Sequence, residues 1–184
     1  FRASAGLGSA DIARFYDSLP LLSISSYLIR QGLPGALIYA CLASQMCPCV
    51  SVNLMHVSFD IVNRSIGGLT GSRVAGMYGL AVGLDMATTC APQWDVYGYR
   101  MGVRVLSAAL WVDNLFAYSS RAADAISILD VAERYLQHKW GLQIKLSSRG
   151  ILACKGADMS AIPDAWNPDS KLTVLGHVVY EDAG

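Results

Sequence analysis

Two acidic segments lie far apart in this chain, and each is embedded in apolar sequence with the composition of a β-strand. Asp11 ends a short apolar run near the start. Asp113 falls in residues 110–118, an apolar run that reads as strand, and we expect it at the tip of a hairpin. Because acids so distant in sequence meet only through the fold, the pattern predicts a sheet that joins them at a site for divalent metal.

The composition bounds the fold to one domain of ordinary size. The chain has 184 residues and a formal net charge of zero, with 53% hydrophobic and 15% charged residues. We therefore expect a single domain over residues 1–184 with one sizeable core. No run reaches the ~18 uninterrupted apolar residues of a membrane span, so we expect no membrane partner. The odd number of five cysteines indicates reduced thiols, and we expect a soluble intracellular protein of the nucleus or cytoplasm.

Cysteine and histidine do not predict a metal centre. Cys47 and Cys49 form the one close pair, and a structural zinc site needs two further ligands. The histidines, His56, His138 and His177, lie far apart in strand-like or helical sequence. We interpret all of them as ordinary structural residues.

The order of predicted elements indicates an α+β fold. The patterns predict strands at residues 8–15, 103–107, 110–118, 143–146, 150–155 and 172–180, and a hairpin at 49–63. Helices are expected up to Arg30 with Asp17 or Ser18 as cap, over 34–45, from the glycine-dense stretch 67–72 to about 88, and after Ser119 or Ser120. The last has one apolar face: Ala122, Ile126, Leu129, Ala132, Leu136 and Trp140.

Five motifs in this order resemble the palm of reverse transcriptases, especially those of non-LTR retrotransposons and group II introns. The resemblance rests on residues 11–17 (DIARFYD), 67–72 (GGLTGS), 111–114 (WVDN), 141–144 (GLQI) and 172–176 (LTVLG). In the same order, these segments are similar to five motifs of that family: the first catalytic Asp motif, a Gly-x-Pro-Gln-Gly-Ser loop, Tyr-x-Asp-Asp, Gly-Leu-x-Ile and a Leu-Gly turn. The resemblance covers nearly the whole chain.

The resemblance implies a polymerase palm, an antiparallel sheet packed on helices with parts of the fingers, whose N-terminal fingers and C-terminal thumb lie outside the fragment. The implied activity is RNA-directed DNA polymerisation of a retroelement, on an RNA template and a DNA primer, from deoxynucleoside triphosphates. Asp11, Asp113 and Asn114 would be catalytic. Mg²⁺ or Mn²⁺ would be held by Asp11, Asp113 and the carbonyl of Ile12, since two metal ions about 4 Å apart serve such phosphoryl transfer.

Four further residues are implied nucleotide or template contacts. Tyr16 resembles a steric gate that crowds a ribose 2′-hydroxyl and so favours deoxynucleotides. Gly71 and Ser72 belong to the glycine loop, which can approach a base pair closely because glycine has no Cβ. Arg73 could contact a phosphate. The alternatives from the residues alone are a packed tyrosine and an exposed arginine in a turn.

Three departures from the family pattern bear on the chemistry. Asn114 stands where the family has its second Asp, and an amide carries no negative charge. Thr70 replaces the usual Gln, and Ser148 and Arg149 fall where a Lys is usual. Arg149 could replace that lysine in position, although a guanidinium is effectively always protonated.

These departures leave other functions open. The chain could be a degenerate, catalytically inactive palm, or the palm of an RNA-directed RNA polymerase. It could also be an unrelated α+β domain whose Asp residues are turn and cap residues. Because the chain is neutral and phosphate binding needs basic surface, we expect the isolated fragment to bind nucleic acid weakly and to show little activity alone.

Overall fold

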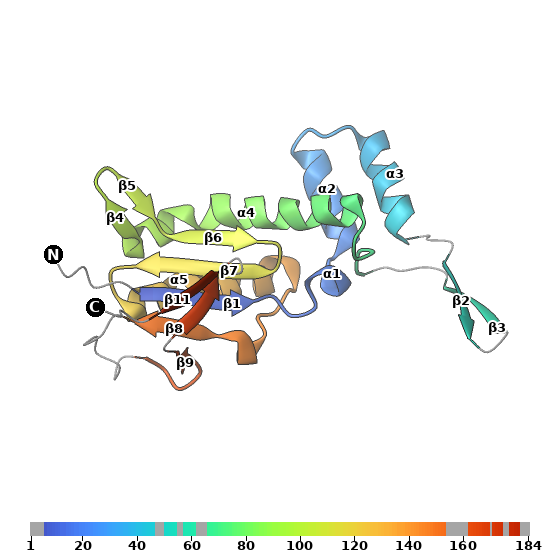
Figure 1. Cartoon of the computed structure of the whole chain (residues 1–184). Helices are drawn as coiled ribbons and strands as arrows, with labels where there is room; N and C mark the ends of the chain where they lie inside the picture. Colours follow the sequence, from blue (N-terminus) through green and yellow to red (C-terminus); the bar gives the residue numbers. More distant parts are fainter. Residues whose placement is uncertain are drawn as a thin grey trace. The chain divides into compact units, whose positions relative to one another are not determined.

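The computed structural model describes residues 6–46, 50–54, 57–61, 66–153, 162–169, 171–174 and 177–180 (Figure 1). It divides into two compact units, residues 1–13 with 85–184 and residues 14–84. Each unit is described by itself. Whether they act as one domain, as the sequence predicts, stays a prediction.

The first unit is built on a five-stranded sheet with the order β6-β7-β1-β8-β9. The strands are β1 (Gly6–Asp11), β6 (Ala108–Trp111), β7 (Asn114–Ser119), β8 (Gly150–Ala153) and β9 (Asn167–Pro168). All neighbours pair antiparallel except β8 and β9. The strand that ends in Asp11 is therefore the central strand of the sheet.

Helix α5 (Ala122–Tyr135) and the π-helical turn that continues it (Leu136–Trp140) cover one face of this sheet. The six residues predicted to share its apolar face are all buried, which confirms that prediction. Two glycines of β1 let the helix come close. A Cβ on Gly8 would lie 2.8 Å from Leu129 Cδ1, and one on Gly6 would lie 2.7 Å from the backbone of Ala122.

Helix α4 (Arg73–Tyr97) reaches the first unit with its second half, where Met86, Cys90 and Trp94 are buried. Asp85 joins this helix to α5 and the π turn. Its Oδ2 accepts hydrogen bonds from Tyr135 Oη at 2.6 Å and from Trp140 Nε1 at 3.1 Å. A buried donor without its acceptor is costly, so this carboxylate fixes the end of α5.

The hydrogen bond between Tyr135 and Asp85 makes stability depend on alkaline pH. Burial first, and then this bond, raises the pKa of Tyr135 to about 12, against about 10 in an unfolded chain. The neutral Tyr135 hydroxyl therefore contributes its full stabilisation below pH 10, and this stabilisation is lost as the pH rises through 12. We expect Tyr135→Phe to lower the free energy of unfolding by about 1 kcal/mol at pH 8. In urea titrations the difference should shrink by pH 11.5; a difference that stays constant would contradict the assignment.

Two hairpins complete the first unit. One pairs β4 (Tyr99–Met101) with β5 (Arg104–Leu106), and the other pairs β10 (Lys171–Val174) with β11 (His177–Tyr180). A short 3₁₀ turn, Leu146–Ser148, precedes β8.

The second unit holds helices α1 (Phe15–Ser18), α2 (Leu21–Arg30) and α3 (Gly35–Met46), the hairpin β2 (Val50–Leu54) with β3 (Val57–Ile61), and the first half of α4. Its core includes Leu21, Ile24 and Ile38, all fully buried. A buried hydrogen bond of 2.6 Å joins the hydroxyls of Ser25 and Tyr78. The pair ties α2 to α4.

The structure confirms the α+β fold and most of the element order, and it corrects several details. Residues 143–146 are not a strand, since only Ile144 bridges to Ile12. The run 110–118 is broken by a turn between β6 and β7. Helix α4 runs nine residues past the expected Thr88, and β4 was not predicted. Residues 47–49, 56 and 154, which include the close cysteine pair, lie outside the described residues.

The predicted helix caps are wrong. A separate helix α1 takes up Asp17 and Ser18, and α2 begins after Pro20 without a side-chain cap. The N-cap of α5 is Arg121, also without one. Ser119 lies two residues earlier, where its Oγ accepts the Arg121 N–H at 3.4 Å.

One described helix, α4, has the length and apolar composition that a membrane span needs. The core helix of a soluble protein passes the same test, and 44% of the apolar window is buried within the structure. The buried positions Ala75, Tyr78, Val82, Met86, Cys90 and Trp94 recur every three or four residues. This is the stripe of a helix that packs against a protein core.

Candidate active site

Strand pairing brings Asp11 and Asp113 together in the first unit. Asp11 is the last residue of β1 and pairs with Asn114, the first residue of β7. The next residue, Ile12, donates its N–H to the Asp113 carbonyl at 2.8 Å. Asp113 itself lies in the turn between β6 and β7, at the hairpin tip that the sequence predicts. The two carboxylates thus share one end of the sheet.

The turn that carries Asp113 has a strained backbone. Trp111 pairs with Asn114, which leaves Val112 and Asp113 as a two-residue loop. Val112 has φ +59°, in the left-handed region that β-branched residues rarely adopt. Trp111 and Val112 are also exposed, with 61% and 44% of their surface accessible. Strain of this kind persists where the surrounding structure holds it, often at functional sites.

We expect Val112→Gly to stabilise the protein, because glycine adopts φ +59° without steric cost. The left-handed conformation costs an L-residue roughly 1–2 kcal/mol. Glycine avoids this cost but loses more conformational entropy on folding, which offsets part of the gain. A net gain of about 0.5–1 kcal/mol in urea unfolding is the expected result. Val103→Gly is the control, since Val103 lies in another two-residue turn without a positive φ. It should lose stability; equal effects at both positions would contradict strain at Val112.

Asp11 carries an unpaired buried oxygen. Its Oδ1 is buried without a hydrogen-bond partner in the part of the chain that the structure describes. Burial raises the pKa of Asp11 above its ordinary value, the nearby negative charge of Asp113 raises it further, and the positive charge of Lys145 lowers it in part. An added cation at this place would relieve both unfavourable effects. The residues present therefore fit a hard divalent ion.

Asn114 acts on Asp113 through its amide. Its Nδ2 donates to Asp113 Oδ1 at 3.0 Å, so this amide orients the neighbouring carboxylate. Among the described residues no group of three or more His, Cys, Asp or Glu side chains converges. The acidic donors here are Asp11 and Asp113, and the role of the Ile12 carbonyl as a further ligand stays a prediction.

The segment after the π turn supports Asp11 and supplies a positive charge. Lys145 N–H donates to the Asp11 carbonyl at 2.8 Å, and the Asp11 N–H donates to Ser148 Oγ at 2.9 Å. Ser148 Oγ in turn donates to the Lys145 carbonyl at 2.6 Å. Sequence reasoning missed Lys145, although it directly follows the GLQI motif. It is the cation whose charge acts on Asp11.

Arg149, which the sequence offers as a positional substitute for a lysine, is engaged by residues of the first unit. Its guanidinium forms an ion pair with Glu133 of α5 and lies 5.5 Å from the ring centroid of Trp166. The side chain is largely covered, with 12% of its surface accessible. These contacts make Arg149 a link between α5 and the segment 162–169.

The other predicted site residues lie in the second unit. Tyr16 is half-buried in α1, and its ring lies 5.4 Å from that of Phe15. Gly79 of α4 makes room for this pair, because a Cβ there would lie 2.8 Å from Phe15 Cε1. Tyr16 is held in place and still accessible, as a residue that contacts a ligand must be.

The glycine loop packs on α1, which sequence reasoning did not predict. Gly67 and Gly68 donate their N–H groups to the carbonyls of Leu19 and Tyr16, at 2.9 and 2.7 Å. A Cβ on Gly67 would lie 2.7 Å from the Asp17 carbonyl oxygen. Gly71 differs, since it has φ +84° and open space around it. Of the three, only Gly71 has open space where a Cβ would lie.

A buried glutamine holds this loop. Gln45 of α3 is 1% exposed. Its Oε1 accepts the Leu69 N–H at 2.8 Å, and its Nε2 donates to Ser72 Oγ at 3.2 Å. Ser72 Oγ also accepts the Val74 N–H at 3.2 Å, so Ser72 caps the start of α4. No sequence motif singled out Gln45, because a lone glutamine in an apolar helix carries no pattern.

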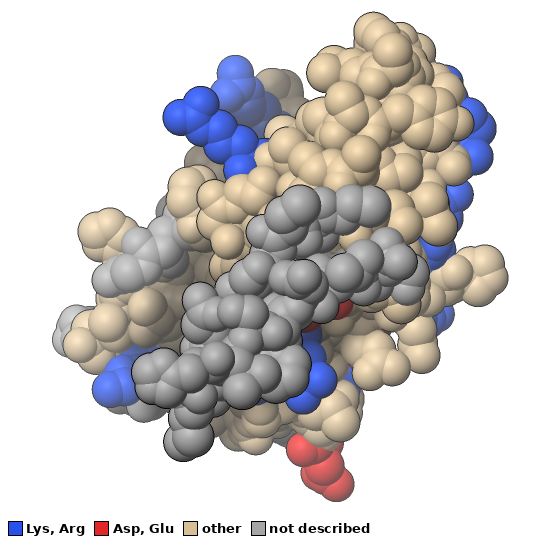
Figure 2. Space-filling model, turned by 90° about the vertical axis from the view of Figure 1, so that its right-hand side faces the viewer, with Lys and Arg blue, Asp and Glu red and all other residues tan. Residues whose placement is uncertain are grey.

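Arg73 is exposed at the start of α4. On the face drawn in Figure 2, the Lys and Arg side chains of the described residues lie in several separate groups. This agrees with the zero net charge of the sequence.

Comparison of folds relates this architecture to a known polymerase. The chain is similar to the structure of apo telomerase from Candida tropicalis truncated from its C-terminal domain, with a TM-score of 0.56 and 10% sequence identity. The likeness covers 97% of this chain and 34% of that one. The chain has an α+β polymerase-like fold. The relation to reverse transcriptases is distant, and it concerns the fold alone.

The chain thus spans about a third of the length of that telomerase structure. No protein-family model matches the chain, and no curated protein matches it in sequence. The roles of the site residues therefore depend on the geometry described above.

Proposed function

We propose that this chain is the palm of an RNA-directed DNA polymerase of a retroelement, which adds deoxynucleotides to a primer by metal-assisted nucleotidyl transfer. The observation that carries the proposal is the pairing of β1 with β7, which sets Asp11 beside the Asp113 turn. The orphaned Asp11 oxygen beside a second carboxylate supports it. The polymerase-like fold, shared with a telomerase, agrees with it.

Asp11 and Asp113, with the Ile12 carbonyl, would hold Mg²⁺ or Mn²⁺. Such ions, when bound, stabilise negative charge on the attacking and leaving oxygens of phosphoryl transfer. The chain's own groups position the reaction. The hydrogen bond from Asn114 orients Asp113, and the bonds of Lys145 and Ser148 fix the end of β1. Rigid support of this kind is what positioning the reactants requires.

Tyr16 would select deoxynucleotides by excluding a 2′-hydroxyl. Its ring is fixed against Phe15, which packs at Gly79. The loop with Gly71 and Ser72, and Arg73 after it, would contact the template or the incoming nucleotide. The RNA template, the DNA primer and the deoxynucleoside triphosphates are the proposed partners.

An inactive palm is the second candidate, and two observations favour it. The second acidic position is an amide, and Arg149, at the position of the usual lysine, is engaged by Glu133 and Trp166. Such a palm would keep the fold without the reaction.

Primer extension on an RNA template by the full-length protein, with Mg²⁺ or Mn²⁺, separates the two candidates. We expect extension with deoxynucleotides, and we expect Tyr16→Ala to increase ribonucleotide incorporation while extension continues. Tyr16→Phe is the matched control. It keeps the aromatic ring that would exclude the 2′-hydroxyl, so it should keep the selection. A folded protein that extends no primer with either ion would refute the proposal. Extension with ribonucleotides alone would instead assign an RNA-directed RNA polymerase.

A further inference from the structure

The hairpin of β4 and β5 exposes an unusual set of side chains in the first unit. Met101, Val103 and Leu106 are 59%, 102% and 40% exposed, and Val96 at the end of α4 is 72% exposed. Arg100 and Arg104 are exposed beside them. Clustered exposed apolar residues mark contact surfaces, and this cluster is distinct from the site at Asp11.

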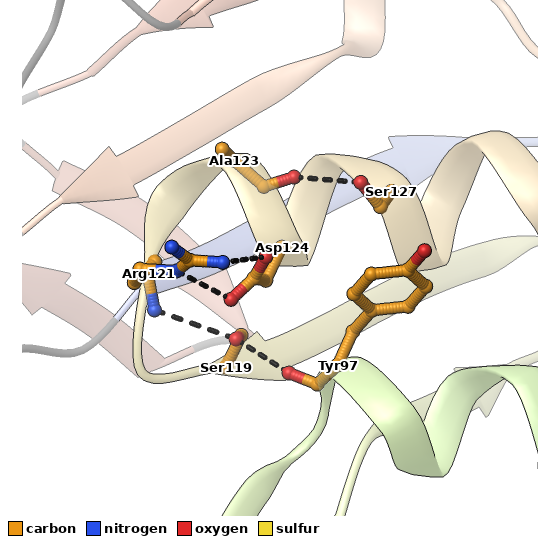
Figure 3. Close-up of polar contacts among 6 residues, drawn as sticks. All are labelled: Tyr97, Ser119, Arg121, Ala123, Asp124 and Ser127. Carbon is orange, nitrogen blue, oxygen red and sulfur yellow. Dashed lines mark hydrogen bonds and ion pairs between the residues drawn. The ribbon is translucent and has the colours of Figure 1, made fainter.

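The base of the hairpin is firmly anchored. Ser119, 1% exposed, donates its Oγ hydrogen to the Tyr97 carbonyl at 2.6 Å and accepts the Arg121 N–H at 3.4 Å (Figure 3). Gly98 bridges to Ser119, and a Cβ there would lie 2.4 Å from Val105 Cγ1. The chain therefore presents the apolar tip on a fixed support.

The two arginines lie on opposite faces of the ribbon. Arg100 pairs with Val105 and Met101 pairs with Arg104, and successive side chains of a strand alternate between faces. Among the described residues, neither arginine side chain takes part in an ion pair. Gly102 has φ +62° at the first turn position, which a tight two-residue hairpin favours. The result is a narrow two-stranded ribbon with a cation on each face and an apolar tip.

A nucleic-acid duplex fits this shape and charge. A two-stranded ribbon can enter a groove, where phosphates lie on both sides and apolar tips contact base edges or sugars. By composition the first unit has ten basic and twelve acidic residues. The segment between Asp95 and Asp113, which contains the hairpin, has no acidic residue. A flat apolar partner would meet one face of the ribbon and leave a cation on the other unused.

We propose that the β4–β5 hairpin enters the groove of a nucleic-acid duplex, with Arg100 and Arg104 on phosphates and Met101 and Val103 at the tip. The partner rests on the proposed function, since a polymerase must hold its duplex. The hairpin lies at the opposite end of β6 and β7 from the Asp113 turn (Figure 1). A six-residue strand spans about 20 Å, so the contact would be remote from the chemistry.

Duplex binding by the full-length protein tests the proposal, measured by fluorescence anisotropy in EDTA over a range of salt. A DNA duplex and an RNA–DNA hybrid of equal length are the probes, and the tighter one identifies the duplex form. We expect Arg100→Ala with Arg104→Ala to weaken binding and to reduce the salt slope by about 1.8, since each phosphate contact contributes about 0.9. Met101→Ser with Val103→Ser should weaken binding without changing the slope.

Arg121→Ala is the matched control, because Arg121 is an exposed arginine already paired with Asp124 at 2.7 Å (Figure 3). It should keep the wild-type slope. Circular dichroism checks that each variant is folded. The proposal would be overturned if the double arginine variant kept the wild-type salt slope and duplex affinity. It would also be overturned if Arg121→Ala lost as much duplex affinity as the double variant. An absence of duplex binding would overturn it too, as would self-association of the wild type that Met101→Ser with Val103→Ser abolishes.

The two proposals can fail separately. A protein that binds duplex through the hairpin but extends no primer would refute the polymerase reaction and keep the hairpin contact. A protein that extends primers equally well in the double arginine variant, with an unchanged salt slope, would refute the hairpin contact alone.

Discussion

Gly6→Ala is expected to destabilise the protein severely. The added Cβ would lie 2.7 Å from Ala122 N and from Arg121 C, and 2.8 Å from Ala122 Cα. These are backbone atoms at the start of α5, so relief requires the helix to move off the sheet. We expect a loss of about 3 kcal/mol or more in the free energy of unfolding, which is a large share of the ~5–15 kcal/mol of a typical domain.

Two other glycines provide graded controls in the same urea titration. Gly8→Ala should cost less, since the nearest atom is Cδ1 at the flexible end of Leu129. Gly76→Ala in α4 should gain about 0.5–1 kcal/mol, because nothing lies within 4 Å and alanine favours helix. Equal stabilities for the Gly6 and Gly8 variants would contradict the close approach of α5 to β1.

Asp113→Ala is expected to lower the rate of primer extension by about 10³-fold. Electrostatic stabilisation by metal ions is worth several kcal/mol in such transfers, and about 4 kcal/mol corresponds to this factor. The turn is exposed around Trp111 and Val112, so the variant should fold and should bind duplex like the wild type. Asp124→Asn, which removes an exposed ion pair, is the control and should leave the rate unchanged. Comparable rates in Asp113→Ala and the wild type would exclude Asp113 from the reaction.

Asn114→Asp separates an active palm from a decayed one. The change removes the amide that donates to Asp113 and adds a third negative charge beside Asp11 and Asp113. Like charges at close range are unfavourable, so the variant should be less stable without divalent ions and should regain stability with them. An increase in extension rate over a silent wild type would favour the inactive palm.

The sequence predicted the elements that repeat a clear pattern. The apolar face of α5 follows the helical period, and the alternation in residues 50–61 gave β2 and β3. The meeting of Asp11 with Asp113 was expected from the motif order. Pairing of β1 with β7 then supplied the register that no pattern encodes.

What the sequence could not predict arises from tertiary contacts. Gly67 and Gly68 are glycines because their backbone packs closely against α1 and the residue that follows it, and no sequence pattern indicates this contact. The roles of Arg149 and Gln45 depend on partners distant in the sequence. Arg149 pairs with Glu133, and Gln45 bonds the loop around Leu69. The caps were wrong because Ser and Asp favour turns as well as helix starts.

Paramagnetic broadening by Mn²⁺ in the NMR spectrum of the chain tests the central claim most directly, since it detects weak binding without nucleotide. We expect substoichiometric Mn²⁺ to broaden the amide signals of Asp11, Ile12, Asp113 and Asn114 first, and excess Mg²⁺ to restore them. Asp113→Ala should abolish this selectivity. Signals at Asp11 and Asp113 that stay sharp while exposed acids such as Asp164 broaden would contradict a metal site at this pair.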